Sequence, residues 1–558
     1  MLVLKKSTSI LIKRNLYMKE ETCEQFFSWL FDKKVKMFSE RDISTLEDIY
    51  YPEEIKRVID TDQMQRLKKI MQLSTIIIDN PSAYHTRYDH SIGTYNNGVK
   101  VYLNQLENPN WIEEHSSKEE KLQIIASLLE LLTHDIGHLT FSHTLESIIG
   151  YHGAHEIITD RILSEELKDV LEAINPDLPE VMLQRRNHKF ATLKEGNIDL
   201  DRMDYLLHDY IYLNGENHEL EDISAHILEH ISLERINGEN LVPVFDNEII
   251  PELQKFLELR VDQYQKFYNS NYRAMSDNTC RCFGEILVKS EEPSAKRFVE
   301  YLKECMRKGT NLDLSTHTSW NDIHTLNSFL DIIEKSEDQD LVDVAQICTP
   351  DLMGLVNLVY KMVDFPEEVD KDDCDLKQLI PDEEERKLYL KVKKYVKGEN
   401  LTPREKIIRE ELMLKSKTKK SISMYEFSEE GLENVKKQME HLNLPEDLLD
   451  KIIWQKKIKI YSPQNINFAK TADGKIVELI NHPNFSLDTT PIFIRGGFLN
   501  QALLREYGVS QENINQLANI FEMNGVKLDN SKKKNYIVPR VSETEDIEYK
   551  RINSSEER

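Results

Sequence analysis

The side chains needed for metal and phosphate chemistry are concentrated in one short stretch, LLTHDIGHLTFSH at 131–143. It places His134 directly before Asp135, which pairs a neutral imidazole nitrogen with a hard carboxylate oxygen. Two ligands from other helices would complete a shell of two histidines and two aspartates, and His90 and Asp201 are the candidates. Such a shell suits a divalent ion, and Mn, Fe, Mg, Zn and Ni are not distinguished.

The same stretch contains a candidate proton donor. Glu146 follows His143 by three residues, so on a helix its carboxylate lies within reach of the imidazole. A carboxylate in that position holds the imidazole tautomer and raises its pKa. An imidazole supported in this way can protonate a departing alkoxide or orient a water.

Helices must carry these side chains. The segment 121–135, KLQIIASLLELLTHD, is apolar on nearly every face, which predicts a helix buried on all sides that delivers the His-Asp pair into the interior. Further helices are expected over 85–102 and 197–212, which contain the other two candidate ligands. Neither a GxGxxG nor a GxxxxGK[ST] loop is present, so dinucleotide and Walker-type phosphate binding are unsupported. We expect a mostly α fold.

The chain of 558 residues is too long for one compact core. We predict an N-terminal extension at 1–44, a helical catalytic core at 45–365, an acidic linker at 366–386 and a smaller C-terminal α+β accessory region at 387–558. The linker is predicted from its density of Asp and Glu, which is typical of solvated segments.

Charge and cysteine usage restrict the partners. The formal net charge of −26 argues against a general nucleic-acid coat, although a metal and a few basic side chains can make one pocket attractive to an anion. The six cysteines form no CxxC pair, which favours reduced thiols over a disulfide framework. No apolar run approaches the roughly 18 residues of a membrane span. We expect a cytoplasmic protein with no membrane partner.

Four stretches in chain order carry a resemblance: HTRYDHSIG, THDIGHLTFSH, HGAHE and IDLDRMDYLLHD. Together they resemble the HD-domain superfamily, and within it the deoxynucleoside triphosphate triphosphohydrolases of the SAM-and-HD-domain and bacterial dGTPase kind. The resemblance covers roughly residues 45–290, and we recognise no SAM domain before it. It implies an HD-domain helical core with a divalent metal on His90, His134, Asp135 and Asp201.

The resemblance also implies a reaction, in which a metal-oriented water attacks the α-phosphorus of a dNTP and releases deoxynucleoside and intact triphosphate. His143 would protonate the 5′-oxygen, and the other implied catalytic residues are His138, Glu146 and His155. Substrate contacts are implied at Arg87, Arg202 and Lys266 for phosphate, Tyr205 and Asp209 for the sugar, and Arg260 and Tyr268 for phosphate and sugar.

Some positions depart from the family pattern. Members activated by a nucleotide carry DTPQFQRLR where this chain has DTDQMQRLK, so Asp60, Gln65 and Lys68 are candidate activator contacts with a lysine in place of an arginine. Tyr264 stands where a substrate histidine is expected, which leaves base and sugar preference open. The family also implies assembly into a homo-oligomer, as a dimer, tetramer or hexamer.

Two alternative functions stay open at this point. An HD-type phosphodiesterase or nuclease acting on cyclic or oligomeric nucleotides would use the same metal site. A nucleotide-sensing scaffold without turnover would retain the fold, but all four candidate ligands are present here.

Overall fold

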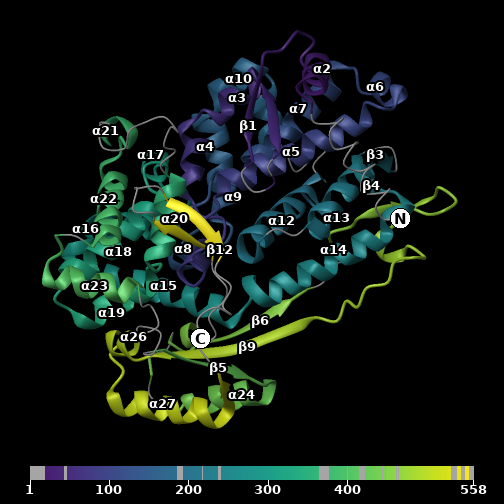
Figure 1. Cartoon of the computed structure of the whole chain (residues 1–558). Helices are drawn as coiled ribbons and strands as arrows, with labels where there is room; N and C mark the ends of the chain where they lie inside the picture. Colours follow the sequence, from purple (N-terminus) through teal and green to yellow (C-terminus); the bar gives the residue numbers. More distant parts are fainter. Residues whose placement is uncertain are drawn as a thin grey trace.

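A computed structural model describes residues 19–42, 45, 47–184, 193–215, 218–236, 240–362, 376–398, 400–413, 422–442, 444–445, 448–459, 461–462, 464–528, 537–541 and 547–551. Helices make up 64% of it, so the predicted mostly α class is confirmed. Figure 1 shows most of the helices gathered in one body, with long strands below it and two more helices on the far side of those strands.

Three helices at the centre carry the candidate metal ligands. They are α5 (Arg87–Gln105), α7 (Lys118–Thr133) and α12 (Leu200–Asn214), and α5 packs against both of the others. The predicted all-round burial of α7 is confirmed, because every residue from Ile124 to Thr133 is buried. Each helix begins at a side-chain cap that binds its first free N–H groups, supplied by Thr86, Ser117 and Asp199.

Two short helices follow the His-Asp pair, α8 (His143–Ile149) and α9 (Ala154–Arg161). α15 (Asn271–Ser290) packs against α8 and follows α14 (Ile250–Gln263) in the chain after a π-helical turn at Tyr264–Tyr268. The other helices before the C-terminal region are α2 (Glu20–Leu30), α3 (Glu53–Ile59), α4 (Asp62–Arg66), α6 (Pro109–Glu114), α10 (Lys168–Ile174), α11 (Leu178–Leu183), α13 (His218–Glu229), α16 (Lys296–Lys308), α17 (Leu314–Thr318), α18 (Asp322–Lys335), α19 (Gln339–Cys348), α20 (Leu352–Met362), α21 (Leu376–Leu379), α22 (Glu383–Lys397) and α23 (Pro403–Met413).

The strands form small sheets. An N-terminal hairpin pairs β1 (Met37–Arg41) with β2 (Asp48–Pro52) in antiparallel register, with Ser39 opposite Tyr50. A second sheet has the order β3 (Ile231–Ile236), β4 (Asn240–Phe245), β7 (Phe468–Lys470), β8 (Ile476–Glu478). A third has the order β10 (Gly525–Lys527), β5 (Ile422–Phe427), β9 (Ile492–Asn500), β6 (Ile453–Ile458), and β11 (Ile537–Val541) pairs with β12 (Ile547–Arg551).

The C-terminal region contacts the helical core at several places, two of which involve its strands. β7 runs parallel to β4 of the core hairpin, with Phe468 opposite Val244. The sheet containing β9 packs on α15, where the Trp454 indole N–H donates to Asn271 at 2.9 Å. The helices α24 (Glu429–Met439) and α27 (Gln511–Asn524) cover its other face (Figure 1), and α26 (Gln501–Glu506) follows β9.

Part of the predicted acidic linker, residues 366–375, lies outside the described residues. The rest of the predicted linker contains α21 and the start of α22, and α22 packs on α18 and α20. Glu385 within it is buried and accepts a hydrogen bond from Lys69 at 2.7 Å. Among the described helices none alone has the length and apolar composition of a membrane span; α19 with Leu352–Val359 reaches it only as a pair bent by 57°.

Candidate active site

The four predicted metal ligands converge. His90 lies in the first turn of α5, Asp201 in the first turn of α12, and His134 and Asp135 directly follow α7. His90 Nε2 lies 3.1 Å from His134 Nε2 and 3.1 Å from Asp201 Oδ1. Asp135 Oδ1 lies 3.5 Å from His134 Nε2. Three helix ends, distant in sequence, therefore bring the ligand atoms of His90, His134 and Asp201 together, and the Asp135 carboxylate lies beside them.

The hydrogen bonds behind these side chains fit a metal cofactor. His134 Nδ1 donates to the Leu131 carbonyl at 2.9 Å, and His90 Nδ1 donates to Asp204 Oδ2 at 2.7 Å. With both Nδ1 atoms protonated, each Nε2 has a lone pair directed into the cluster. Two such lone pairs 3.1 Å apart repel each other unless a positive charge, either a proton on His90 Nε2 or a metal ion, lies between them. The residues present therefore fit a divalent metal ion, and they do not select its identity.

Neighbouring charges and burial shift the pKa values of the cluster side chains in different directions, and burial lowers that of His134. Burial alone would lower the pKa of His90, but its hydrogen bonds with Asp201 and Asp204 raise that pKa to about 10. Burial would raise the pKa of Asp135, yet the Arg87 guanidinium and neighbouring histidines hold it well below its usual range. Asp135 is therefore ionised at any physiological pH, as a metal-binding carboxylate must be.

Arg87 connects this cluster to the turn that leads to His143. Its Nη1 donates to Asp135, and its Nε donates to the Ser142 hydroxyl at 2.9 Å. Arg87 is buried, so this predicted phosphate contact lies at the metal cluster while also holding the turn.

That turn adopts a rarely populated backbone conformation. Phe141 and Ser142 have φ values of 50° and 47°, in the left-handed region that non-glycine residues avoid. Such residues cost on the order of 1–3 kcal/mol each and persist where surrounding contacts impose them. Here Asp322 accepts the Phe141 N–H at 2.7 Å, and Ser74 donates to the Phe141 carbonyl at 2.7 Å. This strained conformation turns the chain so that α8 begins at His143.

The predicted catalytic residues form a second cluster beside the first. Glu146 is buried and accepts from His143 Nδ1 at 2.9 Å and from His155 Nδ1 at 2.7 Å. It also accepts the backbone N–H of His155 at 3.0 Å and of Gly153 at 3.3 Å. These bonds outweigh burial and lower the pKa of Glu146, so the carboxylate stays ionised and keeps both Nδ1 atoms protonated. The His143 side chain is 61% exposed, so it is the member that can meet a substrate.

His138 links the two clusters. Its ring stacks on His155 with centroids 4.1 Å apart, and its Nε2 lies 3.3 Å from Asp135 Oδ1. Burial, together with the charge on Arg87, lowers the pKa of His138 well below its usual value, so this imidazole is neutral. The close approach of α9 depends on Gly137, where a Cβ would overlap the backbone of His155 and Thr159.

The predicted sugar contacts Tyr205, Asp209 and Tyr268 lie together, between α12 and the π-helical turn after α14. Asp209 is buried and accepts from the Tyr268 hydroxyl and from His85, whose Nε2 lies 2.6 Å away. Tyr205 and Tyr264 share a hydrogen bond of 3.0 Å between their hydroxyls. Tyr205 also packs edge-on to His90, which puts this aromatic group next to the metal cluster.

The predicted basic contacts differ in their surroundings. Arg202 pairs with Asp199, and Arg260 donates to the Asn197 carbonyl at 3.0 Å, so both hold the segment entering α12. Lys266 instead pairs with Asp262 at 2.7 Å and is largely exposed.

The candidate activator contacts make local interactions. Asp60 pairs with Lys56, and the Gln65 amide donates to the Ile59 carbonyl at 2.8 Å. The Lys68 ammonium lies over the Tyr88 ring, 4.5 Å from its centroid. None of these three contacts reaches the two clusters.

Several residues of the site were missed by sequence reasoning. Asp204 binds His90, and Asp322 holds the strained turn. His208 and His85 contact Asp204 and Asp209 respectively. Asp204 and His208 lie within IDLDRMDYLLHD, and their helical spacing from Asp201 was the available signal.

No family model matches this chain. Among curated relatives, a protein of Acanthamoeba polyphaga mimivirus named as HD domain-containing is 34% identical over 191 residues, covering 28% of this chain and 40% of the relative. The Dictyostelium discoideum homolog of the deoxynucleoside triphosphate triphosphohydrolase SAMHD1 is 28% identical over 205 residues, covering 33% of this chain and 39% of the relative. The chain belongs to the HD-domain superfamily.

This HD-domain protein also matches an uncharacterised protein of Methanocaldococcus jannaschii over a longer stretch. The two are 31% identical over 290 residues, which cover 52% of this chain and 54% of the relative. The chain thus spans about half, or less, of the curated relatives it matches. A solved phosphohydrolase from Bacteroides thetaiotaomicron has a similar fold, with a TM-score of 0.53, 16% identity and coverage of 83% of this chain and 99% of that one. An overlap of that extent includes part of the C-terminal region.

Proposed function

We propose that this HD-domain protein hydrolyses deoxynucleoside triphosphates to deoxynucleoside and intact triphosphate. The observation that carries the proposal is the contact between the two clusters, in which His138 touches Asp135 on one side and stacks on His155 on the other. A metal site and a carboxylate-backed histidine pair thus lie side by side, as phosphoester hydrolysis requires. Relatives named as deoxynucleoside triphosphate triphosphohydrolases support the substrate class.

A divalent ion held by His90, His134, Asp135 and Asp201 would neutralise phosphate charge and activate a water. Arg87, buried against Asp135, adds a fixed positive charge beside the same phosphate. Its planar guanidinium can bind phosphate oxygens in pairs, which suits a polyphosphate better than an ammonium group does.

The proton for the departing 5′-oxygen would come from His143. Its Nδ1 is held by Glu146, which leaves Nε2 on the exposed side of the ring to carry the transferred proton. The negative charge on Glu146 stabilises the imidazolium form that must be present before transfer. His138 is kept neutral by its burial, so we assign it to orienting water or phosphate rather than to proton donation.

A nucleoside would lie against the aromatic group formed by Tyr205, Tyr264 and Tyr268. Tyr205 contacts both the His90 ring and the Tyr268 ring, so this group extends away from the metal cluster. Asp209 lies within this group and can accept a hydrogen bond from a sugar hydroxyl if that hydroxyl displaces Tyr268 or His85 from the carboxylate. A tyrosine packed against the sugar would also exclude a 2′-hydroxyl.

The decisive experiment is product analysis. The full chain loaded with Mn²⁺ is incubated with each dNTP, each NTP, a cyclic dinucleotide and a short oligonucleotide, and products are separated by ion-exchange chromatography. We expect deoxynucleoside and intact triphosphate from dNTPs, and no turnover by the paired variant His134→Ala, Asp135→Ala, which should also lose bound metal. Mononucleotides released from an oligomer would establish the phosphodiesterase or nuclease alternative instead. Absence of any turnover would favour a sensing scaffold.

Assembly and activation stay predictions. A dimer, tetramer or hexamer is checked by light scattering with and without nucleotide. Activation through Asp60, Gln65 and Lys68 predicts that a guanine nucleotide raises dNTP turnover, and that Gln65→Ala abolishes the increase while leaving the unstimulated rate unchanged.

A further inference from the structure

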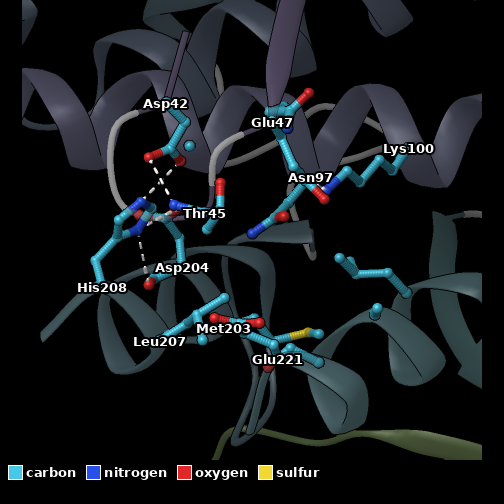
Figure 2. A pocket seen from close by; sticks show the side chains of 15 residues that line it. Asp42, Thr45, Glu47, Asn97, Lys100, Met203, Asp204, Leu207, His208 and Glu221 are labelled. Atoms are coloured by element: carbon cyan, nitrogen blue, oxygen red, sulfur yellow. Dashed lines mark hydrogen bonds and ion pairs between the residues drawn. The ribbon is translucent and has the colours of Figure 1, made fainter. Parts of the chain in front are cut away.

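A hydrogen-bonded chain leads from the metal cluster to the far side of α12. His90 Nδ1 donates to Asp204 Oδ2 at 2.7 Å, and Asp204 Oδ1 lies 3.1 Å from His208 Nδ1. His208 Nε2 in turn lies 3.0 Å from Asp42 Oδ2. Figure 2 shows Asp42, His208 and Asp204 meeting in this way. The order is therefore Asp42, His208, Asp204, His90.

The members of this chain come from three separate elements. Asp204 and His208 are four residues apart on α12, His90 lies on α5, and Asp42 follows β1 of the N-terminal hairpin. Asp42 belongs to the segment that sequence analysis assigned to an N-terminal extension outside the core. The hairpin thus contributes Asp42, which is linked through His208 and Asp204 to the proposed metal ligand His90.

Gly93 makes the arrangement sterically feasible. It lies one turn after His90 on α5, where a Cβ would overlap Asp204 Oδ1 and approach His208 Cε1 to 2.8 Å. Asp204 and His208 therefore occupy the space that any other residue at position 93 would fill. Both side chains are held tightly, since each is only 3% exposed.

Charge keeps the links in place. Burial would lower the pKa of His208, but the two carboxylates at its ring nitrogens raise that pKa well above its usual value. A protonated His208 donates at both nitrogens, so Asp42 and Asp204 are each fixed by a charge-assisted hydrogen bond. Asp204 is then prevented from rotating away from His90.

We propose that His208, anchored by Asp42, is a positioning residue for the metal ligand His90. It acts through Asp204, which accepts the hydrogen bond from His90 Nδ1–H and so directs Nε2 at the metal. Outer-shell partners of this kind change metal affinity by roughly 10–100-fold when removed. The inference rests on the proposed function only in assuming that the four converging residues bind a divalent ion.

A small polar cavity beside His208 makes the test practicable. It measures about 60 Å³ and its lining includes Asn96 and Ser224. Figure 2 shows Asp42, Lys100, Asp204 and His208 around it. Asn96 Oδ1 and Ser224 Oγ are buried there without a protein hydrogen-bond partner. A polar cavity needs roughly 10–15 Å³ to hold one water, so this one is large enough for water to enter. Water can therefore replace part of a substituted His208, and the variants should fold.

The experiment measures Mn²⁺ affinity of the full metal-free chain by titration calorimetry, for wild type, His208→Gln, Asp42→Asn and the double variant. We expect His208→Gln to weaken Mn²⁺ binding about tenfold or more, Asp42→Asn to weaken it less, and the double variant to match His208→Gln, because Asp42 acts through His208. His115→Gln is the matched control: it too is a buried histidine, bonded to the Trp111 carbonyl, and should leave affinity unchanged.

A second readout separates positioning from general destabilisation. With Co²⁺ as probe, the visible absorption spectrum of His208→Gln should shift, since a displaced His90 alters the ligand field, whereas the control spectrum should match wild type. If His208→Gln binds Mn²⁺ with the affinity of the wild type and gives the same Co²⁺ spectrum, the positioning role is overturned and the proposed function is left intact. A wild-type chain that binds neither Mn²⁺ nor Co²⁺ would overturn the metal site, and the positioning role with it.

Discussion

Replacing Glu146 by glutamine removes one charge and preserves shape, which isolates the support of the proposed proton donor. The carboxylate accepts from both His143 Nδ1 and His155 Nδ1, and from two backbone N–H groups near His155. A glutamine side chain has only one accepting oxygen, so one imidazole loses its charged acceptor and faces an amide N–H instead. The four proposed metal ligands are not changed.

The size of the effect follows from those bonds. A hydrogen bond to a charged group contributes about 1.5–3 kcal/mol, and each 1.36 kcal/mol in the barrier is tenfold in rate. If the bond to His143 supports the imidazolium only while it donates its proton, kcat should fall by roughly 10–150-fold. KM should change little, because Glu146 is buried behind the two histidines.

The assay is steady-state dNTP hydrolysis by Glu146→Gln, with bound metal measured in parallel. Glu156→Gln is the control, an exposed carboxylate directly after His155 that should leave kcat unchanged. In a His143→Ala background, Glu146→Gln should add no further loss, because the group that it supports is gone. A kcat within threefold of wild type would refute the assigned support, and loss of metal alongside activity would show that Glu146 serves the metal cluster instead.

Three further predictions concern the surrounding structure. Asp322→Ala leaves two buried backbone N–H groups without their acceptor, so the unfolding free energy should fall by roughly 2–6 kcal/mol in urea denaturation, while Asp322→Asn should lose less. Asn467→Ala removes the bonds that hold the segment entering α12, and calorimetry should show Mn²⁺ affinity about tenfold weaker. Asp331 is partly buried, but three lysines lower its pKa from 3.8 to about 2. Because the folded pKa of Asp331 is depressed, its contribution of about 2 kcal/mol to the unfolding free energy is present above pH 3.8 and is lost as the pH falls toward 2. Acid-unfolding curves of Asp331→Asn should lack this pH-dependent loss.

Local sequence patterns predicted the helices well because burial and capping act over short distances. The apolar run before His134 predicted a helix buried on all sides, and α7 is one. The pairing of β7 with β4 could not be predicted, since the two strands are more than 200 residues apart and β7 has only three residues. The left-handed backbone at Phe141 and Ser142 was equally hidden, because contacts from Asp322 and Ser74 impose it.

The sequence by itself determined the chemical types at this site. Histidine and aspartate side chains at fixed helical spacings indicate metal and proton chemistry, and their order along the chain carries the resemblance to the HD-domain superfamily. Only the tertiary structure decided that His90, His134, Asp135 and Asp201 meet at one point, that His138 is buried and neutral, and that Asp42 reaches His208. The physical reason is that burial, hydrogen-bond partners and ring pKa values depend on which helices pack together, which helical periodicity within one segment does not specify.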